Sequence, residues 1–531
     1  MAGPGAGLAL GVTAAEVVEA PDHRGTRGVA RGGLANMVGS ALAGGTGVVV
    51  TWVVARGLGA EQAGAFFAAT AAFALAGGLA KLGTQTGLVY WPARLRATGR
   101  DHLLGACLRI ALTPVCVLAV GLAVAMWFGA PAIARLSAAD SPQTVAAHIT
   151  ALRVLAVFLP LQALTDVLLT ATRGYKAMRP TVTLDRVLRS TLQLLCVGAV
   201  GTATLWAATL PAFAFAWAAP YLPVVILAAF ALRRTYLAGK PAGERARHRE
   251  RRELRRDFWR FTGPRALASV AQIALQRVDV LLVAALGGLA PAAIYAVAGR
   301  FVVLIQFANQ GISQSVQPRL AEALAVGDRD TANHLYQTAT GWLVLVTWPI
   351  SFCVILFAPV YLGLFGSDYR RGADVVVVLA CAMLVATGCG MVDMVLAMAG
   401  RTSWNLVNVL IALGVTVGLD VLLIPRYGAL GAAIGLACAM VANNVLPLVQ
   451  IGRVARLHPF GAGTLTAAGL SVACFGVLPY LVTAVAGPGT AGLSLAVALA
   501  VPAFAAGAWL LRGRLGLHAF LPRKHTLRRT G

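Results

Sequence analysis

The fold is decided by one apolar stretch, QIALQRVDVLLVAALG at residues 272–287. Most of its side chains are hydrophobic, yet Arg277 and Asp279 carry charges two positions apart in its middle. A charge at the centre of a bilayer costs at least about 2.5–3.5 kcal/mol on insertion scales, so charged residues are rare there. The stretch therefore predicts a membrane-spanning helix with a polar site inside the membrane.

The whole chain has the composition of a polytopic membrane protein. Of its 531 residues, 58% are hydrophobic and only 12% are charged, and the mean hydropathy is +0.77. Apolar runs of about 18 residues or more recur along it, each long enough to cross the hydrocarbon core as a helix. We therefore predict an all-α polytopic membrane protein with fourteen spans, at about 34–55, 63–90, 106–128, 147–171, 183–205, 208–232, 261–285, 291–316, 337–360, 374–399, 403–424, 429–452, 463–486 and 491–511.

The basic residues give these spans an orientation. With the N-terminus inside the cell, the predicted cytoplasmic segments carry 31 of the 44 Lys and Arg residues, and the outer segments carry five. This asymmetry follows the positive-inside rule. It also accounts for the formal net charge of +24 without a nucleic-acid partner. We expect a multi-pass protein of the plasma (inner) membrane with both termini in the cytoplasm.

A strongly basic segment divides the spans into two groups of six. It is predicted to be a cytoplasmic, interfacial linker that binds anionic membrane lipids. Residues 58–73 and 286–301 align without gaps, and each joins the first two spans of its half, so we interpret the halves as parallel repeats. The expected organisation is a disordered tail at 1–33, an N-terminal lobe at 34–232, the linker at 233–260, a C-terminal lobe at 261–452, two further spans within 463–511 and a basic tail at 512–531.

Polar side chains recur at helical spacing on the first two spans of each half. In the seventh span, Arg265, Ser269, Gln272, Gln276 and Asp279 share one helix face. Such stripes also hold helices together through interhelical hydrogen bonds, but their charges on related helices favour a water-filled cavity. The corresponding residues are Asn36, Ser40, Gly47 and Thr51 in the first span, Thr70, Gly77, Lys81 and Gln85 in the second, and Gln306, Gln310, Ser313 and Gln317 in the eighth.

Other charges inside the spans lie off these stripes. Arg277 points about 200° away from Asp279 on an ideal helix, so we expect it to reach the outer headgroups or a neighbouring helix. Arg300 lies off its stripe but can still reach the cavity. For Asp166 and Asp393, a structural pair with a nearby Arg and a role in transport both stay open. Asp185, Arg186 and Arg189 are interpreted as interfacial residues.

The sequence carries no signature of a nucleotide-binding enzyme or a zinc protease. It has no Walker loop, dinucleotide-binding glycine pattern or HExxH motif. The eight cysteines fall inside apolar runs without metal-type spacing, which is typical of small packing residues. We therefore expect no enzyme activity, no metal and no cofactor.

Five stretches, taken in order, carry a resemblance to a known family. They are VARGLGAEQAGAF (54–66), RVDVLLVAALGGLAPAAIYAVAGRF (277–301), QPRLAEAL (317–324), LFGSDYRRGADVVVVLA (364–380) and LLIPRYGALGAAIG (422–435). Together, over about residues 30–460, the chain resembles the polysaccharide-biosynthesis (O-antigen-flippase-like) branch of the multidrug/oligosaccharidyl-lipid/polysaccharide exporter superfamily. The resemblance implies a V-shaped bundle of two six-helix lobes, in which the first two helices of each lobe line a central cavity.

The resemblance also implies a function. Family members flip an undecaprenyl-pyrophosphate-linked oligosaccharide from the inner to the outer leaflet by alternating access, often driven by a proton or sodium gradient. Carried over by position, Lys81, Arg265 and Arg300 would bind the pyrophosphate, and Asp279 would couple an ion or pair with one of these cations. A polysaccharide polymerase and glycosyltransferases would be the protein partners.

Three alternatives stay open. Two spans beyond residue 460 give the chain the span number of the related lipid II flippases, which makes a peptidoglycan precursor an alternative substrate. A cation-coupled multidrug exporter of the same superfamily would favour acidic over basic cavity residues. A membrane scaffold that recruits polysaccharide enzymes through residues 233–260 would tolerate neutral substitutions at Lys81 and Asp279.

Overall fold

The computed structural model describes residues 23–137, 141–175, 177–202, 209–238, 247–487 and 490–517. Within these ranges every regular element is a helix, which confirms the predicted all-α fold. Residues 1–22 and 518–531 lie outside the described residues, and so does most of each predicted tail. The first helix begins at His23, earlier than the expected start at residue 34.

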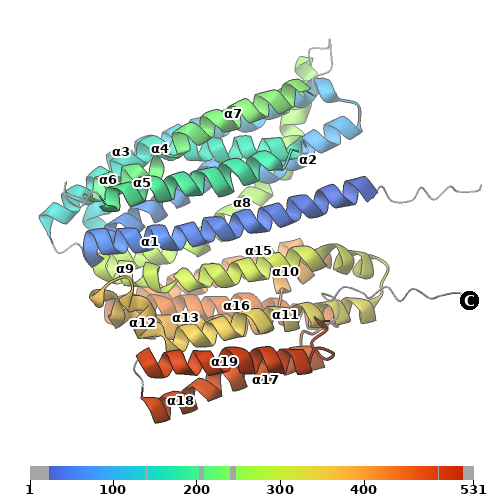
Figure 1. Cartoon of the computed structure of the whole chain (residues 1–531). Helices are drawn as coiled ribbons and strands as arrows, with labels where there is room; N and C mark the ends of the chain where they lie inside the picture. Colours follow the sequence, from blue (N-terminus) through green and yellow to red (C-terminus); the bar gives the residue numbers. More distant parts are fainter. Residues whose placement is uncertain are drawn as a thin grey trace, which may run out of the picture.

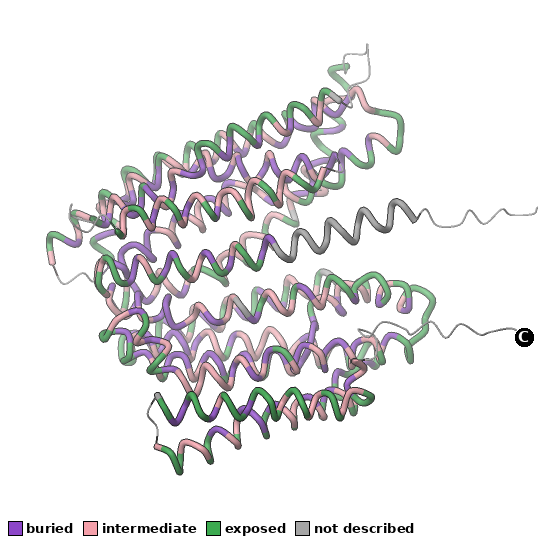
Figure 2. The backbone as a smooth tube through the Cα atoms, in the orientation of Figure 1, coloured by how far each residue is buried: buried purple, intermediate pink, exposed green. Residues whose placement is uncertain are grey.

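The N-terminal lobe is a bundle in which α1 lies next to the second lobe (Figure 1). Apolar side chains line its interior, and Figure 2 shows buried residues on the sides of the helices that face one another. Its elements are α1 (His23–Ala80), α2 (Thr84–Ala97), η1 (Asp101–Leu103), α3 (Leu104–Leu136), α4 (Pro142–Gly174), the π-helical η2 (Thr181–Arg189), α5 (Ser190–Thr202), α6 (Leu210–Ala218) and α7 (Tyr221–Ala238).

The C-terminal lobe repeats this arrangement, and a short helical group lies on its far side (Figure 1). Its elements are α8 (His248–Leu286), α9 (Leu289–Ala298), α10 (Arg300–Ala325), α11 (Arg329–Leu356), α12 (Ala358–Gly363), η3 (Ser367–Gly372), α13 (Ala373–Gly388), α14 (Val392–Met398), α15 (Thr402–Tyr427) and α16 (Ala429–Val454). The added group is α17 (Ala462–Ser471), η4 (Val472–Val477), α18 (Leu478–Ala486) and α19 (Thr490–Leu510).

The described residues contain 12 stretches that are long and apolar enough to cross a membrane. The first of them, Gly39–Ala97, holds two of the predicted spans, because α1 has a non-helical residue at Gly59. The predicted fifth span corresponds to η2 and α5, which were not among the 12. The predicted number of about fourteen spans therefore agrees with the helices.

The repeat junctions share a backbone feature. Gly59 has a φ of 72° between the first two spans, and Gly288 has a φ of 102° at the equivalent point of the second half. Glycine adopts such left-handed conformations at little cost because it lacks a Cβ. The two residues differ by one position from the gap-free alignment, in which Gly59 is opposite Gly287.

Among the described residues, two predicted spans are broken at residues with positive φ, where the sequence predicts a continuous helix. The second span stops at Ala80 and restarts at Thr84, because Leu82 and Gly83 both have positive φ. The tenth is interrupted between α13 and α14, where Gly390 has a φ of 76°. Helix breaks at membrane depth are tolerated where protein or a cavity satisfies the freed backbone groups.

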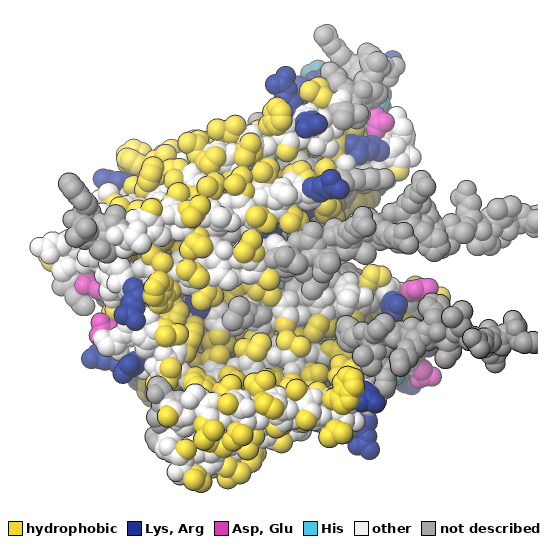
Figure 3. Space-filling model, in the orientation of Figure 1, with side chains coloured by type: hydrophobic (Ala, Val, Ile, Leu, Met, Phe, Trp, Pro, Cys, Tyr) yellow, Lys and Arg dark blue, Asp and Glu magenta, His cyan; other side chains and the backbone are white. Residues whose placement is uncertain are grey.

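The surface of the molecule fits a bilayer. Hydrophobic side chains cover the flank of the bundle, while charged side chains gather towards its two ends (Figure 3). Large apolar residues such as Phe128, Phe230 and Leu422 are 76%, 64% and 62% exposed, which in water would be unfavourable. Helix α1 begins and α19 ends at the same end of the bundle (Figure 1), as an even number of spans requires.

The predicted linker 233–260 is not a segment separate from the lobes. Residues 239–246 lie outside the described residues, but His248 and the residues after it form the first turns of α8. Leu254 and Phe258 are buried there, and the ring of Phe258 lies against Gly87 of α2. Helix α8 thus begins on the N-terminal lobe and continues into the C-terminal lobe.

Candidate functional site: a polar cavity in the C-terminal lobe

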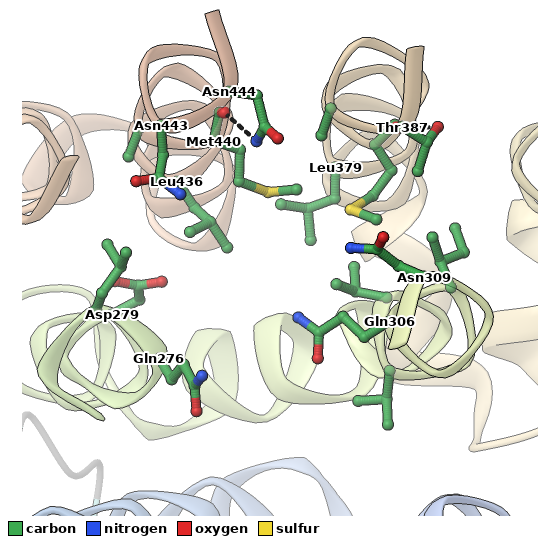
Figure 4. Close-up of a pocket in the computed structure, with 18 of the residues that line it drawn as sticks. Gln276, Asp279, Gln306, Asn309, Leu379, Thr387, Leu436, Met440, Asn443 and Asn444 are labelled. Carbon is green, nitrogen blue, oxygen red and sulfur yellow. Dashed lines mark hydrogen bonds between the residues drawn. The ribbon is translucent and has the colours of Figure 1, made fainter. Parts of the chain in front are cut away.

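A cavity of about 370 Å³ lies among helices of the C-terminal lobe (Figure 4). Helices α8, α9 and α10 form one side of it, and α11, α13, α14 and α16 complete its wall. Apolar residues such as Leu379, Leu436 and Met440 provide part of the lining. Its polar lining residues are Gln272, Gln276, Arg277, Asp279, Tyr295, Arg300, Gln306, Asn309, Thr387, Asp393, Asn443 and Asn444.

The stripe predicted on the seventh span is divided by the structure. Gln272, Gln276 and Asp279 line the cavity, whereas Ser269 and Arg265 lie closer to the start of α8 and do not. The guanidinium of Arg265 is exposed, lies 3.9 Å from the ring centroid of Phe261 and donates a hydrogen bond to the Phe261 carbonyl. The proposed anion-binding role of Arg265 therefore has no support from the cavity.

Two arginines line the cavity, and both reach towards the N-terminal lobe. Arg300, the first residue of α10, lies with its guanidinium 5.8 Å from the ring centroid of Phe67. Arg277 is exposed to the cavity and interacts electrostatically with Tyr221. Of the two alternatives for Arg277, the outer headgroups or a neighbouring helix, the structure favours the neighbouring helix, because the long side chain turns into the cavity towards Tyr221 of α7.

Neither arginine has a carboxylate partner among the described residues. No ion pair within 4.0 Å forms at Arg277 or Arg300 in this part of the chain, and the buried Nε of Arg300 has no hydrogen-bond partner there. The two guanidinium groups also repel each other. Two uncompensated cations at membrane depth are costly, so the arrangement favours an anionic ligand in this cavity.

Two buried carboxylates lie close to each other at α8 and α15, and one of them, Asp279, lines the cavity. Asp279 is 4% exposed and accepts a hydrogen bond from the hydroxyl of Tyr295 at 2.8 Å. Asp420 of α15 is 0% exposed, and within the described residues neither of its oxygens has a hydrogen-bond partner. The two carboxylates interact electrostatically. Two buried like charges destabilise each other, so a proton or a cation bound there would lower the cost.

Asp420 was missed in the sequence analysis although it lies inside the predicted span 403–424. It has no polar stripe around it, and its only sequence signal is a carboxylate in an apolar window. The Asp420 carboxylate packs against Gly435 of α16, where an added Cβ would overlap Asp420 Oδ1. Glycine at residue 435 therefore makes room for this carboxylate.

Lys81, the anion-binding candidate of the N-terminal lobe, is paired with a carboxylate. Lys81 Nζ lies 2.6 Å from Asp166 Oδ2, and the two side chains are 15% and 24% exposed. Asp166 is thus paired with a lysine rather than with an arginine. Because Asp166 compensates Lys81, the lysine has less capacity to bind an anion than the two cavity arginines.

The residues interpreted as interfacial form a second polar network of this lobe. Arg189 Nε lies 2.7 Å from Asp185 Oδ1, and Arg186 donates to the hydroxyl of Ser40 at 2.9 Å. Both arginines belong to the π-helical η2 and reach inwards rather than to headgroups alone. Arg186 connects η2 to α1, whereas Arg189 pairs within η2 and lies over the ring of Tyr221 in α7.

The remaining predicted cavity residues lie outside the cavity wall. Thr51 and Thr70 donate to carbonyls of their own helix, and Gln85 is half-buried on α2. Ser313 donates to Asn309 Oδ1 at 3.4 Å, and Gln310 and Gln317 continue along α10 past the cavity. The side chain of Asn36 lies outside the described residues.

The two lobes meet tightly at the predicted outer end. Trp52 Nε1 and Arg56 Nε both donate to the carbonyl of Leu364, at 2.8 and 2.9 Å. A Cβ at Gly64 would overlap the backbone carbonyl of Leu289. The structure is therefore closed at this end.

Two family profiles match the chain. The profile described as polysaccharide biosynthesis protein matches residues 29–324, and the one described as MatE matches residues 264–422. A search of curated protein sequences gives no match.

The fold is similar to those of several solved transporters. The structure of the lipid II flippase MurJ in an inward closed conformation has a TM-score of 0.69 at 13% identity, over 90% of this chain and 98% of that chain. An inward-facing multidrug resistance MATE family transporter has a TM-score of 0.63 at 18% identity, over 77% of this chain and 93% of that chain. A MOP superfamily transporter from Pyrococcus furiosus has a TM-score of 0.53 at 18% identity, over 81% and 95%. At these identities the likeness concerns the fold.

The polysaccharide biosynthesis profile spans more than half of the chain, from the first span into the eighth. Both profiles describe families of the MOP superfamily, and the similar structures are transporters of the same superfamily. The helices and the apolar flank agree with an integral membrane protein. The chain belongs to the polysaccharide biosynthesis protein family and is a membrane transporter of the multidrug/oligosaccharidyl-lipid/polysaccharide exporter superfamily.

Proposed function

We propose that this chain is a flippase that moves a polyprenyl-pyrophosphate-linked oligosaccharide from the inner to the outer leaflet by alternating access. The observation that carries the proposal is the pair Arg277 and Arg300, two cations that line one cavity without a carboxylate partner among the described residues. Arginine binds phosphate oxygens through two parallel hydrogen bonds, which suits a pyrophosphate. The family description, polysaccharide biosynthesis protein, supports a sugar-containing substrate, and the similar fold of a lipid II flippase supports a lipid-linked one.

The test is translocation of a fluorescent undecaprenyl-pyrophosphate-linked oligosaccharide by purified protein in liposomes. A charge-assisted hydrogen bond contributes about 1.5–3 kcal/mol, so Arg277→Gln or Arg300→Gln should each lower apparent affinity by about 10- to 150-fold. Arg371→Gln, at an exposed position of η3, is the matched control and should transport normally. Normal transport by the Arg277→Gln/Arg300→Gln double variant would refute the anion site.

The buried carboxylates support coupling to a cation. Asp279 and Asp420 lie close enough to interact and have no cationic partner within 4.0 Å among the described residues. Binding and release of a proton or a sodium ion would change the charge beside the cavity, because Asp279 lines it. Transport should therefore depend on an imposed proton or sodium gradient in the same liposomes.

The first turns of α8 support the predicted orientation of the protein and its predicted contacts with anionic lipids. Leu254 and Phe258 are buried on one side of the first turns of α8, while the exposed arginines there are Arg249, Arg252, Arg255, Arg256 and Arg260. Anionic headgroups of the cytoplasmic leaflet attract such a segment by about 1 kcal/mol per basic residue. We place this end, and with it both termini, at the cytoplasmic face of the plasma (inner) membrane.

A cation-coupled multidrug exporter is the second candidate, because Asp279, Asp393 and Asp420 lie in the region that the MatE profile matches. A cationic drug would need these carboxylates and would be repelled by Arg277 and Arg300. Efflux of a cationic dye that survives Arg277→Gln but fails in Asp279→Asn would favour this reading. Lipid II is an alternative substrate for the same anion site. A membrane scaffold that does not transport would tolerate all of these substitutions.

A further inference from the structure

The cavity is lined by an unusual number of side-chain amides. Six of them come from three helices, two each from α8, α10 and α16. They are Gln272, Gln276, Gln306, Asn309, Asn443 and Asn444. Figure 4 shows Gln306, Asn309 and Asn443 turned into the space that α8 and α10 share with α13 and α16.

Only part of this amide cluster is used to hold the fold together. Asn444 donates to the carbonyl of Met440 on its own helix at 2.8 Å. Asn443 Oδ1 is buried and has no hydrogen-bond partner among the described residues. Gln276 and Gln306 are exposed to the cavity, and within the described residues their amides make no hydrogen bond. A buried acceptor without a partner is costly, so Asn443 Oδ1 favours a ligand that donates to it, and the amides of Gln276 and Gln306 are accessible to the same ligand.

The chemistry of the cluster selects a class of ligand. An amide offers two N–H donors and a carbonyl acceptor, and a sugar hydroxyl both donates and accepts. Leu379, Leu436 and Met440 add apolar surface between the amides (Figure 4), which suits the C–H faces of a sugar ring. An amphiphilic cation needs no such array of uncharged donors and acceptors. The exposed Asp393 carboxylate in the same cavity opposes a sugar that carries a carboxylate.

We propose that Gln276, Gln306 and Asn443 form a saccharide subsite that binds the hydroxyl groups of a neutral or N-acetylated sugar next to the phosphate group. The proposal rests on the proposed function, because Arg277 and Arg300 line the same cavity and would hold the adjoining pyrophosphate. The cavity then recognises the glycosyl pyrophosphate as a unit. The lipid without its sugar would occupy only the part of the cavity next to Arg277 and Arg300.

The test compares two ligands on purified protein in nanodiscs. One is undecaprenyl pyrophosphate, and the other is the same lipid carrying a single N-acetylglucosamine, glucose or galactose. Wild-type protein should bind at least one glycosylated lipid about tenfold or more tightly than the bare lipid, as two or three added hydrogen bonds allow. Gln306→Leu and Asn443→Leu should each lower this ratio towards one, because leucine keeps the approximate size and removes the hydrogen bonds.

Gln314→Leu is the matched control, because Gln314 is exposed on the same helix, α10, and does not line the cavity. It should keep the wild-type ratio. The saccharide subsite is refuted if no glycosylated lipid binds more tightly than the bare lipid, or if Gln306→Leu and Asn443→Leu keep the preference. Affinity for the bare lipid and its loss in Arg277→Gln test the proposed function separately, since the arginine variant should weaken both ligands by the same factor.

Discussion

Gly64 is the position where one added methyl group should change the balance between conformations. It lies after the Gly59 junction on α1, and its Cβ in Gly64→Ala would overlap the Leu289 carbonyl of α9. The obstacle is backbone rather than a flexible side chain, so one lobe has to move away from the other. Overpacking of this kind typically costs about 1–3 kcal/mol. The cost falls on the conformation that is closed at the outer end, and it corresponds to a shift of about 5- to 150-fold in the equilibrium between closed and open forms.

The assay is a distance measurement between spin labels at Ala60→Cys and Asp368→Cys, in a background without the eight native cysteines. Gly64→Ala should broaden and lengthen this distance distribution and slow translocation. Gly45→Ala is the control, because a Cβ at Gly45 of the same helix meets no atom within 4 Å. If Gly64→Ala keeps both the wild-type distances and the wild-type rate, then the Gly64–Leu289 contact does not determine closure.

Three further predictions follow from the buried charges. Asp420→Asn should remove the dependence of translocation on the imposed gradient and raise the Tm, because it replaces a buried, partnerless carboxyl with a neutral group; unchanged gradient dependence would contradict this. Gly435→Ala should lower stability by about 1–3 kcal/mol, and Asp420→Ala should restore the Tm, since the overlap is with Asp420. Lys81→Ala should lower the Tm because it leaves Asp166 unpaired. The Lys81→Ala/Asp166→Ala double variant should recover the Tm. Loss of transport with an unchanged Tm would instead indicate that Lys81 binds the anion directly.

The two cavity arginines differ from Lys81 and Arg189 of the N-terminal lobe in their ion pairing. In the N-terminal lobe, Lys81 and Arg189 have carboxylate partners at hydrogen-bonding distance. In the C-terminal lobe, Arg277 and Arg300 have none among the described residues. Paired charges stabilise a bundle, whereas unpaired ones are available to a ligand. The functional site is therefore asymmetric although the two halves are repeats.

The sequence by itself determined the membrane-spanning fold, because length and hydropathy along the chain are local properties. The spacing of Gln272, Gln276 and Asp279 also placed them on one helix face, since the helical period is fixed. The tertiary structure decided which charges have partners. Asp420 meets Asp279, and Lys81 meets Asp166, across many intervening residues. Periodicity predicts a face but not its neighbours, so the turn of Arg277 into the cavity became visible only when the helices were packed together.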